Sequence, residues 1–284
     1  MTKTKPGSVV VGVDGSAHSD AAIAWAVGYA ALGDRPLLIV NATGQHGPGS
    51  LLDTQEARKT TRIAARRVTD RALGLARRMA PGLEVSVATP TGDARSVLLD
   101  LADHAAMIVV GTRGHGPVTS LLLGSVSIAV ASHAPCAVAV VRPRDEPATA
   151  VVVGVASDGS DGSALEFAAV LASASGSGLE LVHGWHSGER YIELLDHEHH
   201  RELKDLHERL LAEATSGLTE KFPDVKMDRQ LRDQSPVDAL VERSAAAECV
   251  VVGARRRSGL RSLLGSVSRG VIEHAHCTVV VVRD

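Results

Sequence analysis

The sequence predicts an α/β protein made of two tandem, doubly wound domains, each built on a five-stranded parallel sheet. Short β-branched runs alternate with longer helical patterns, and this alternation is typical of parallel sheets covered by helices on both faces. Continuous apolar runs such as Val9–Val11 fit strands that are buried on both sides. The same order of elements occurs twice within 284 residues, a length that suffices for two domains with a core each.

The elements of the first copy follow from these patterns in chain order. Apolar and β-branched runs predict strands at 8–13, 36–41, 83–88, 106–110 and 136–141. Longer periodic stretches predict helices at about 19–31, 51–80, 93–104 and 124–133. The helix at 51–80 carries arginines on one side and apolar residues such as Ile63 and Leu73 on the other, as amphipathic surface helices do. We expect its basic side to be solvated.

The duplication is visible when the chain is aligned with itself. At a shift of 142 residues, Val9–Val13 matches Val151–Val155 and Val109–Gly111 matches Val251–Gly253. One residue is then lost, and Gly124–Ser127 matches Gly265–Ser268. A period of this length indicates domain duplication. Prolines and charges interrupt the pattern near 143–147, so we expect domains at 1–145 and 148–284.

A glycine-rich stretch in the first copy is the strongest functional signal. It reads GTRGHGPVTSLLLGSVS from Gly111 to Ser127, between an apolar strand and a helical pattern. A strand, a glycine loop and a helix N-terminus in this order favour an anion such as phosphate, because backbone N–H groups and the helix dipole point at it. The alternative is a flexible βα loop with a serine cap. Asp14 closes the first strand and would share the crevice if the two strands are neighbours; a turn-forming aspartate is the alternative.

These residues together resemble the universal stress protein family in its tandem form. The features are Val-Val-Gly-Val-Asp-Gly-Ser at 10–16, the spaced glycines with Gly124-Ser125, Ser-His-Ala-Pro-Cys at 132–136 and the closing apolar strand. The resemblance implies an adenine nucleotide alpha hydrolase-like fold with strand order 3-2-1-4-5, pairing of domains through the last strand, and ATP, with or without Mg²⁺, as the cofactor. It implies ATP contacts by Gly12, Val13, Asp14, Val40, Gly111, Thr112, Arg113, Gly114, Gly116, Gly124, Ser125, Val126 and Ser127. For Val40, a plain core position is the alternative.

The second copy departs from this pattern. Ala156 stands where the first copy has Asp14, and Asp158 lies two residues further on, where it would either substitute for Asp14 or form a turn. The loop Gly253-Ala-Arg-Arg-Arg-Ser-Gly259 is one residue shorter and has no equivalent of Gly114. Its arginines could still attract phosphates. We expect a weakened or empty second site, with Gly154, Gly253, Gly265, Ser266, Val267 and Ser268 as its candidate residues.

Composition narrows the class of partner and the compartment. The formal net charge of −3 and an aromatic content of 2% argue against nucleic acid as a partner. No apolar run approaches the roughly 18 residues of a membrane helix, and the N-terminus has no signal-peptide core. Three cysteines without a CxxC spacing argue against a secreted disulfide framework. These observations predict a soluble cytoplasmic protein.

Catalytic and metal-binding patterns are weak. No P-loop motif and no nucleophile–base pair are recognisable from spacing, so we expect no enzyme beyond a weak ATPase. The segment Asp-His-Glu-His-His at 196–200 puts His197 and His200 on one helix face, with His207 two turns beyond His200. That face could bind a transition metal, but a solvated helix face is the preferred interpretation, and no metal site is predicted.

The resemblance therefore predicts an ATP-binding, stress-response regulatory module whose nucleotide is held mainly in the first domain. Two alternatives remain: a slow ATPase or phosphotransferase, in which Asp14 or a loop serine works with Mg²⁺, and a nucleotide-independent interaction scaffold. The expected partners are an adenine nucleotide, the other domain of the same chain and an unknown regulated protein. A homodimer is compatible with the sequence.

Overall fold

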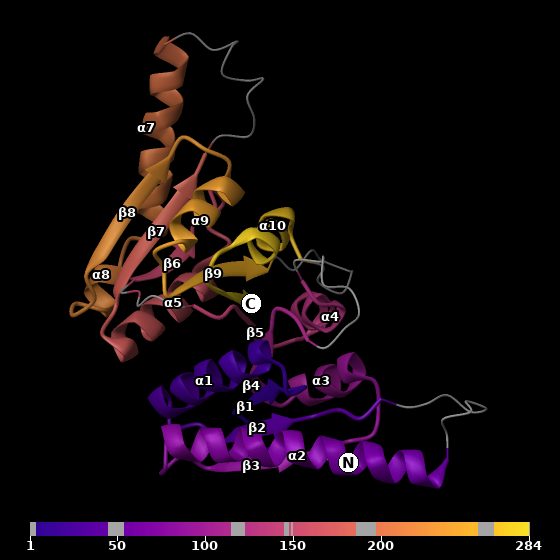
Figure 1. Cartoon of the computed structure of the whole chain (residues 1–284). Helices are drawn as coiled ribbons and strands as arrows, with labels where there is room; N and C mark the ends of the chain where they lie inside the picture. Colours follow the sequence, from indigo (N-terminus) through magenta and orange to yellow (C-terminus); the bar gives the residue numbers. More distant parts are fainter. Residues whose placement is uncertain are drawn as a thin grey trace. The chain divides into compact units, whose positions relative to one another are not determined.

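The computed structural model describes residues 4–44, 54–114, 123–144, 148, 150–185, 197–254 and 264–283. The chain divides into two compact units, Met1–Pro143 and Arg144–Asp284, called the first and second unit below. Figure 1 shows that each unit contains its own strands with helices packed on them. The division falls beside the proline- and charge-rich stretch that the sequence marks as a linker.

The first unit contains the five strands and four helices that the sequence predicts. In chain order they are β1 (Ser8–Gly12), α1 (Ala17–Leu32), β2 (Leu37–Val40), α2 (Gln55–Met79), β3 (Val85–Ala88), α3 (Ala94–Ala102), β4 (Ala105–Gly111), α4 (Ser125–His133) and β5 (Ala137–Val141). The ends differ from the expected ones by one or two residues, except that α2 begins at Gln55 and not at residue 51. Thr54 caps this helix in an extended conformation, and its hydroxyl accepts the Ala57 N–H at 3.1 Å.

The first unit's strands form a parallel sheet in the order β3-β2-β1-β4-β5. This is the order that the family resemblance implies. The strand order reverses at β1, which pairs with β2 on one side and with β4 on the other. Val9, Val10 and Val11 of β1 are completely buried, as expected for a central strand covered on both faces. The carboxyl ends of β1 and β4 therefore lie side by side, where doubly wound folds bind ligands.

Helices cover both faces of this sheet and are fixed by local capping. An added Cβ on Gly12 would touch Leu98 of α3, whereas one on Gly111 would meet the backbone of His18 in α1, so α1 and α3 lie on opposite faces. Helix α1 begins after Ser16, whose hydroxyl accepts the Ser19 N–H at 3.2 Å. Side-chain capping of this kind satisfies N–H groups that the helix itself cannot pair.

The second unit repeats this plan. Its elements are β6 (Ala150–Gly154), α5 (Gly162–Ser175), β7 (Gly178–Gly184), α7 (His197–Ala214), α8 (Leu218–Lys221), β8 (Met227–Arg232), α9 (Pro236–Ser244), β9 (Cys249–Ala254), α10 (Ser266–His274) and β10 (Thr278–Arg283). Its strands are all parallel and run β8-β7-β6-β9-β10, the counterpart of the first unit's order. The duplication seen in the sequence is thus a duplication of the fold.

Candidate functional site

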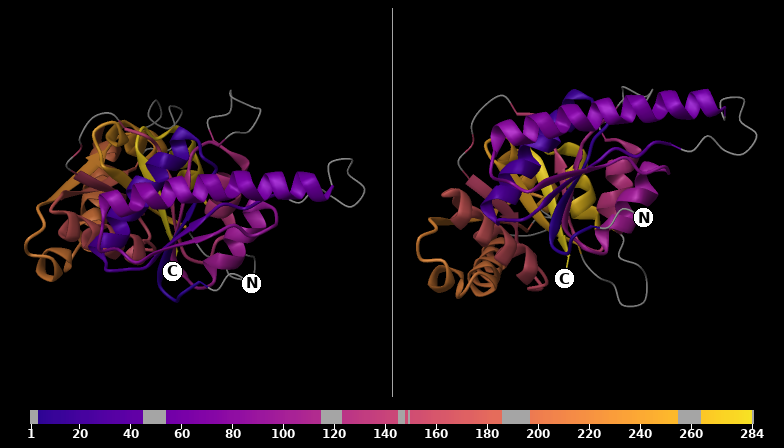
Figure 2. Two further views of the ribbon diagram at one scale, coloured as in Figure 1. Left: turned by 60° about the horizontal axis from the view of Figure 1, so that its bottom comes forward. Right: turned by 90° about the horizontal axis from the view of Figure 1, so that it is seen from below.

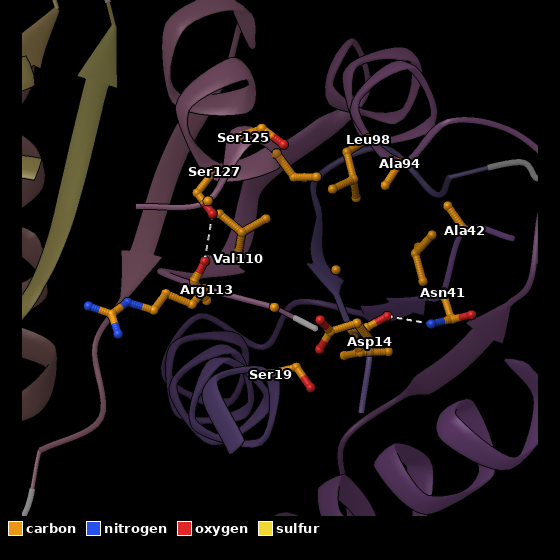
Figure 3. Close-up of a pocket in the computed structure, with 17 residues that line it drawn as sticks. Asp14, Ser19, Asn41, Ala42, Ala94, Leu98, Val110, Arg113, Ser125 and Ser127 are labelled. Atoms are coloured by element: carbon orange, nitrogen blue, oxygen red, sulfur yellow. Dashed lines mark hydrogen bonds between the residues drawn. The ribbon is translucent and has the colours of Figure 1, made fainter. Parts of the chain in front are cut away.

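A pocket of about 280 Å³ opens where β1 and β4 end in the first unit (Figure 3). Its volume is close to the lower end of the range for small-molecule sites. Eleven of the residues expected to contact ATP line it: Gly12, Val13, Asp14, Val40, Gly111, Arg113, Gly114, Gly124, Ser125, Val126 and Ser127. Segments that lie about a hundred residues apart in the sequence therefore share one cavity, as the strand reversal predicts.

Asp14 projects from the end of β1 toward the beginning of the glycine loop (Figure 3). Its Oδ1 accepts the N–H of Ser16 at 2.9 Å, so the carboxylate is held by the turn that starts α1. Gly114 lies directly opposite: a Cβ added there would overlap Oδ2 of Asp14. Asp14 therefore forms a turn, as the alternative interpretation of the sequence expects, and it also lines the pocket.

The N-terminus of α4 supplies the amide-rich side of the pocket. The helix begins after Gly124, which provides no side-chain cap, so the N–H groups of the first turn have no acceptor within the helix. Gly124 itself is fixed because its N–H donates to the Thr112 carbonyl at 2.7 Å. Ser127 Oγ donates to the Gly111 carbonyl, also at 2.7 Å, and ties α4 to the end of β4. Such a helix end favours an anionic ligand.

The opposite side of the pocket is mainly apolar. Val40 is 1% exposed and nevertheless lines the cavity, so it belongs both to the core and to the site. Next to it, Asn41 Nδ2 donates to the Val13 carbonyl at 2.6 Å and fixes the end of β2 against β1. Leu98 and Ala94 of α3 close this side together with Ala42 (Figure 3). The pocket is therefore polar at α4 and apolar at α3.

One expected site residue, Thr112, is not on the pocket wall, and another falls outside the described part of the chain. Thr112 is 2% exposed and its N–H donates to the Val141 carbonyl at 3.0 Å, so it links β4 to β5 instead. Gly116 lies outside the described residues.

Sequence reasoning missed six lining residues. Asn41 could have been found as a polar residue directly after a buried strand, whereas the others carry no such signal: Ser19, Ala42, Ala94, Leu98 and Val110.

In the second unit, the carboxylate comes from a different position. Ala156 replaces the aspartate, and its N–H donates to the side chain of Asp161 immediately before α5. A Cβ added to Gly253, where β9 gives way to the loop, would lie 2.8 Å from Asp161 Oδ1. Asp158 is exposed and accepts the N–H of Ser160 at 3.2 Å, so it forms a turn and does not substitute for Asp14. The buried carboxylate of Asp161 therefore occupies the end of the second sheet.

Other parts of the second site match the first. Helix α10 begins after Gly265, again without a side-chain cap, and its first turn contains Ser266, Val267 and Ser268. Ser268 Oγ donates to the Gly253 carbonyl at 2.7 Å, as Ser127 does to Gly111. Gly154 faces Leu240 as Gly12 faces Leu98, with the added Cβ 3.0 Å from the leucine in both units. The arginines of the second loop lie outside the described residues.

Two histidines of α7, His200 and His207, contact other elements and do not stand on a fully solvated face as expected. His207 Nδ1 lies 2.8 Å from His183 Nε2, and His183 Nδ1 lies 2.7 Å from the Val155 carbonyl, so this pair joins α7 to the ends of β7 and β6. His200 is 3.3 Å from the Asp233 carboxylate.

Within the described ranges, no three His, Cys, Asp or Glu side chains gather as metal ligands. No helix there has the length and apolarity needed to span a bilayer.

Comparisons with known proteins agree with the duplication. A family model described as the universal stress protein family matches residues 7–142 and again 148–283. A universal stress protein of Mycobacterium tuberculosis is 36% identical over 300 residues, covering 99% of this chain and 98% of that protein. One from Mycolicibacterium smegmatis is 34% identical, covering 97% and 96%. The crystal structure of a universal stress protein from Archaeoglobus fulgidus superimposes with a TM-score of 0.72 at 18% identity, covering 98% and 97%, and so shares the fold.

Proposed function

Because this chain belongs to the universal stress protein family in both of its halves, we propose that it is an ATP-binding regulatory protein of the stress response, with the nucleotide held mainly in the first unit. The observation that carries the proposal is the convergence of Asp14, Gly114 and the uncapped end of α4 on one pocket. A carboxylate suits ribose hydroxyls, and free backbone N–H groups suit phosphate oxygens.

We propose a place for each part of the nucleotide from the chemistry of the two sides of the pocket. The apolar side, formed by Val40, Ala42 and Leu98, suits the adenine ring. The phosphates would extend toward Gly124 and the first turn of α4, where the helix dipole is positive. Asp14 lies between the two regions and would accept hydrogen bonds from the ribose. Mg²⁺, where present, would accompany the phosphates.

We propose binding without efficient turnover. Asp14 is the carboxylate that lines the described pocket, and its bond to the Ser16 N–H positions it as a ribose acceptor. ATP would then act by ordering the loops around it and by changing which partners the protein binds, which requires different affinities for the two states. In the second unit, the Asp161 carboxylate beside Gly253 disfavours a phosphate in the corresponding place.

Isothermal titration calorimetry of the full-length protein tests the proposal, with ATP, ADP and AMP in separate titrations and with and without Mg²⁺. We expect the wild type to bind close to one ATP per chain. Asp14→Ala should weaken binding by about tenfold or more, because it removes hydrogen bonds to a charged acceptor. The matched control is Asp158→Ala, which removes an exposed turn aspartate from the second unit and should leave affinity and stoichiometry unchanged.

Two results would contradict the proposal. A wild type that binds no adenine nucleotide would favour the nucleotide-independent scaffold, and an Asp14→Ala variant with unchanged affinity would move the site elsewhere. Phosphate release measured on the same samples separates binding from catalysis. Turnover well below about 1 s⁻¹ is expected; faster turnover would favour the ATPase alternative.

A further inference from the structure

Asp161 of the second unit occupies the sequence position that a pocket serine occupies in the first unit. Strands β6 and β9 pair in the same register as β1 and β4 once the numbering is shifted by 142 residues. This shift matches Ser19 with Asp161 and Asp14 with Ala156. Ser19 lines the nucleotide pocket, so the position of Asp161 belongs to the corresponding end of the second sheet. The second unit has therefore kept a carboxylate there but supplies it from five residues further along the chain.

The side chain of Asp161 is turned away from the helix that it precedes. An aspartate at an N-cap ordinarily accepts N–H groups from the first turn of its own helix, but Asp161 makes no such bond to α5. Its carboxylate instead accepts the Ala156 N–H just beyond β6, and its Oδ1 lies 2.8 Å from a Cβ added to Gly253 of β9. The residue is only 9% exposed. The carboxylate is thus buried between the ends of the two central strands.

The serine at the matching position of the first unit is held differently. Ser19 Oγ accepts the Gly15 N–H at 3.1 Å and donates to the Ser16 carbonyl at 2.9 Å, so it closes the turn that leads into α1. Its hydroxyl is neutral and belongs to this turn. The ends of β1 and β4 therefore border a pocket, and no carboxylate from α1 is placed between them.

The second unit retains the anion-binding helix next to Asp161. Helix α10, near the yellow end of the chain, lies against the strands of its own unit in both views of Figure 2. It begins after Gly265 without a side-chain cap, as α4 does, so its first turn favours an anion. Gly253 joins the two features, because its carbonyl accepts Ser268 Oγ of α10 at 2.7 Å and its Cα faces Asp161. The Asp161 carboxylate therefore lies beside the place where α10 would hold a phosphate.

We infer that the Asp161 carboxylate is an internal anion that occupies the phosphate end of the second site and keeps nucleotide out of it. The carboxylate accepts a backbone N–H, as a phosphate oxygen would in a site of this kind. Two negative charges in one buried place disfavour each other strongly, so Asp161 and a nucleotide phosphate exclude one another. The inference rests on the proposed function, because it requires that this architecture binds nucleotide when it is open. The number of nucleotides held by each chain is then set by Asp161.

Isothermal titration calorimetry of the full-length protein with ATP tests the inference by a gain of binding. Asp161→Ser installs the first unit's residue and should allow each chain to bind a second ATP. Ala156→Asp with Asp161→Ser transfers both first-unit residues and should bind the second ATP about tenfold more tightly than Asp161→Ser alone, because a ribose acceptor is added. Asp161→Asn keeps the size of the side chain, guards against a variant that does not fold, and should also admit a second ATP. The matched control is Asp158→Ser at an exposed aspartate of the same turn, which should bind no second ATP.

Hydrogen exchange at the Ala156 amide reports on the second unit directly. In the wild type this N–H is held by Asp161, so its exchange should be slow and unaffected by ATP. In Asp161→Ser the exchange should be faster, and added ATP should slow it again. Far-UV circular dichroism shows whether each variant is folded.

The possible results separate this inference from the proposed function. A wild type that binds ATP in both units, or in which ATP slows exchange at Ala156, overturns the inference. So does a wild type that binds one ATP while the folded Asp161 variants bind no second one, and this result leaves the proposed function intact. Absence of ATP binding in every protein overturns the proposed function and this inference with it.

Discussion

The carboxylate of Asp14 lies so close to Gly114 that any side chain at position 114 would overlap Oδ2 of Asp14. One residue follows β1 and the other follows β4, yet they form adjacent parts of one pocket wall. The glycine at 114 is therefore required by a specific neighbour, in addition to any freedom that it gives the loop. The second unit has no equivalent of Gly114, and there the residue at the position of Asp14 is Ala156.

The first prediction follows from this contact. Gly114→Ala should displace the Asp14 carboxylate and weaken ATP binding on the order of tenfold, since a small misplacement of a ligand-positioning group has large effects. Calorimetry gives the affinity, and far-UV circular dichroism shows whether the fold is intact. Gly28→Ala in α1 is the control: a Cβ there meets no atom within 4 Å. It should leave affinity unchanged and stabilise the protein by roughly 0.5–1 kcal/mol. Equal affinities in all three proteins would contradict the proposed role of Gly114.

The second prediction separates two serines of α4. Ser127 is buried and donates to the Gly111 carbonyl, so Ser127→Ala should lower the free energy of unfolding by about 1 kcal/mol. Ser125 is exposed at the pocket. Ser125→Ala should change stability by less than about 0.5 kcal/mol but weaken ATP binding by up to about tenfold, because a hydroxyl donor to phosphate is lost. Urea unfolding and calorimetry measure the two quantities. Loss of stability in Ser125→Ala without loss of affinity would reverse the assignment.

The sequence predicts the sheet well because buried parallel strands leave a clear signal. The run Val9–Val11 fits a central strand buried on both faces, and the repeat at 151–153 predicts the same strand in the second copy. The order of strands came from the family resemblance, since periodicity alone cannot tell which strands are neighbours. Asp14 and the glycine loop could be predicted to meet only once β1 and β4 were placed side by side.

Side-chain detail was less predictable, because it depends on contacts that are distant in sequence. Thr112 lies within the glycine signature, but its backbone N–H donates to β5 and the residue does not line the pocket. Asp161 resembles any turn residue in the sequence, and only the fold brings its carboxylate to Ala156 and Gly253. The sequence alone predicts a solvated face for His207, because its partner, His183, lies on a different element and cannot be identified from spacing.

The third prediction concerns an ion pair that joins α9 to β7. Arg243 donates to both carboxylate oxygens of Glu180, at 2.8 and 2.7 Å, and the two side chains are only 28% and 17% exposed. The hydrogen bonds with Glu180 raise the pKa of Arg243, so the guanidinium stays charged. Arg243→Ala leaves the carboxylate of Glu180 without this partner and should destabilise the second unit by about 1.5–3 kcal/mol.

Urea unfolding measures this effect, and a second arginine provides the control. Arg269 pairs with Glu273 at 2.9 Å on the exposed side of α10. Arg269→Ala should cost no more than about 1 kcal/mol, since exposed pairs contribute little. Comparable losses in the two variants would show that partial burial does not strengthen the Arg243–Glu180 pair.

The fourth prediction is a pH dependence that originates at His207. Burial, and to a lesser degree the neighbouring His183, lower the pKa of His207 below its ordinary value of 6.5. The unfolded chain therefore takes up a proton at this position at a higher pH than the folded chain does. The free energy of unfolding should be unaffected by His207 well above pH 6.5 and should fall as the pH decreases from 6.5 toward the lowered pKa.

His207→Gln removes the titrating group and keeps a polar side chain opposite His183. Urea unfolding at pH 7.5, 6.5 and 5.5 should show that the variant loses less stability on acidification than the wild type does. His276→Gln, at an exposed histidine of the same unit, should follow the wild-type curve. Parallel curves for the wild type and His207→Gln would mean that acid sensitivity arises at other groups. A smaller slope in the variant alone would identify the His183–His207 contact as the point where α7 responds to pH.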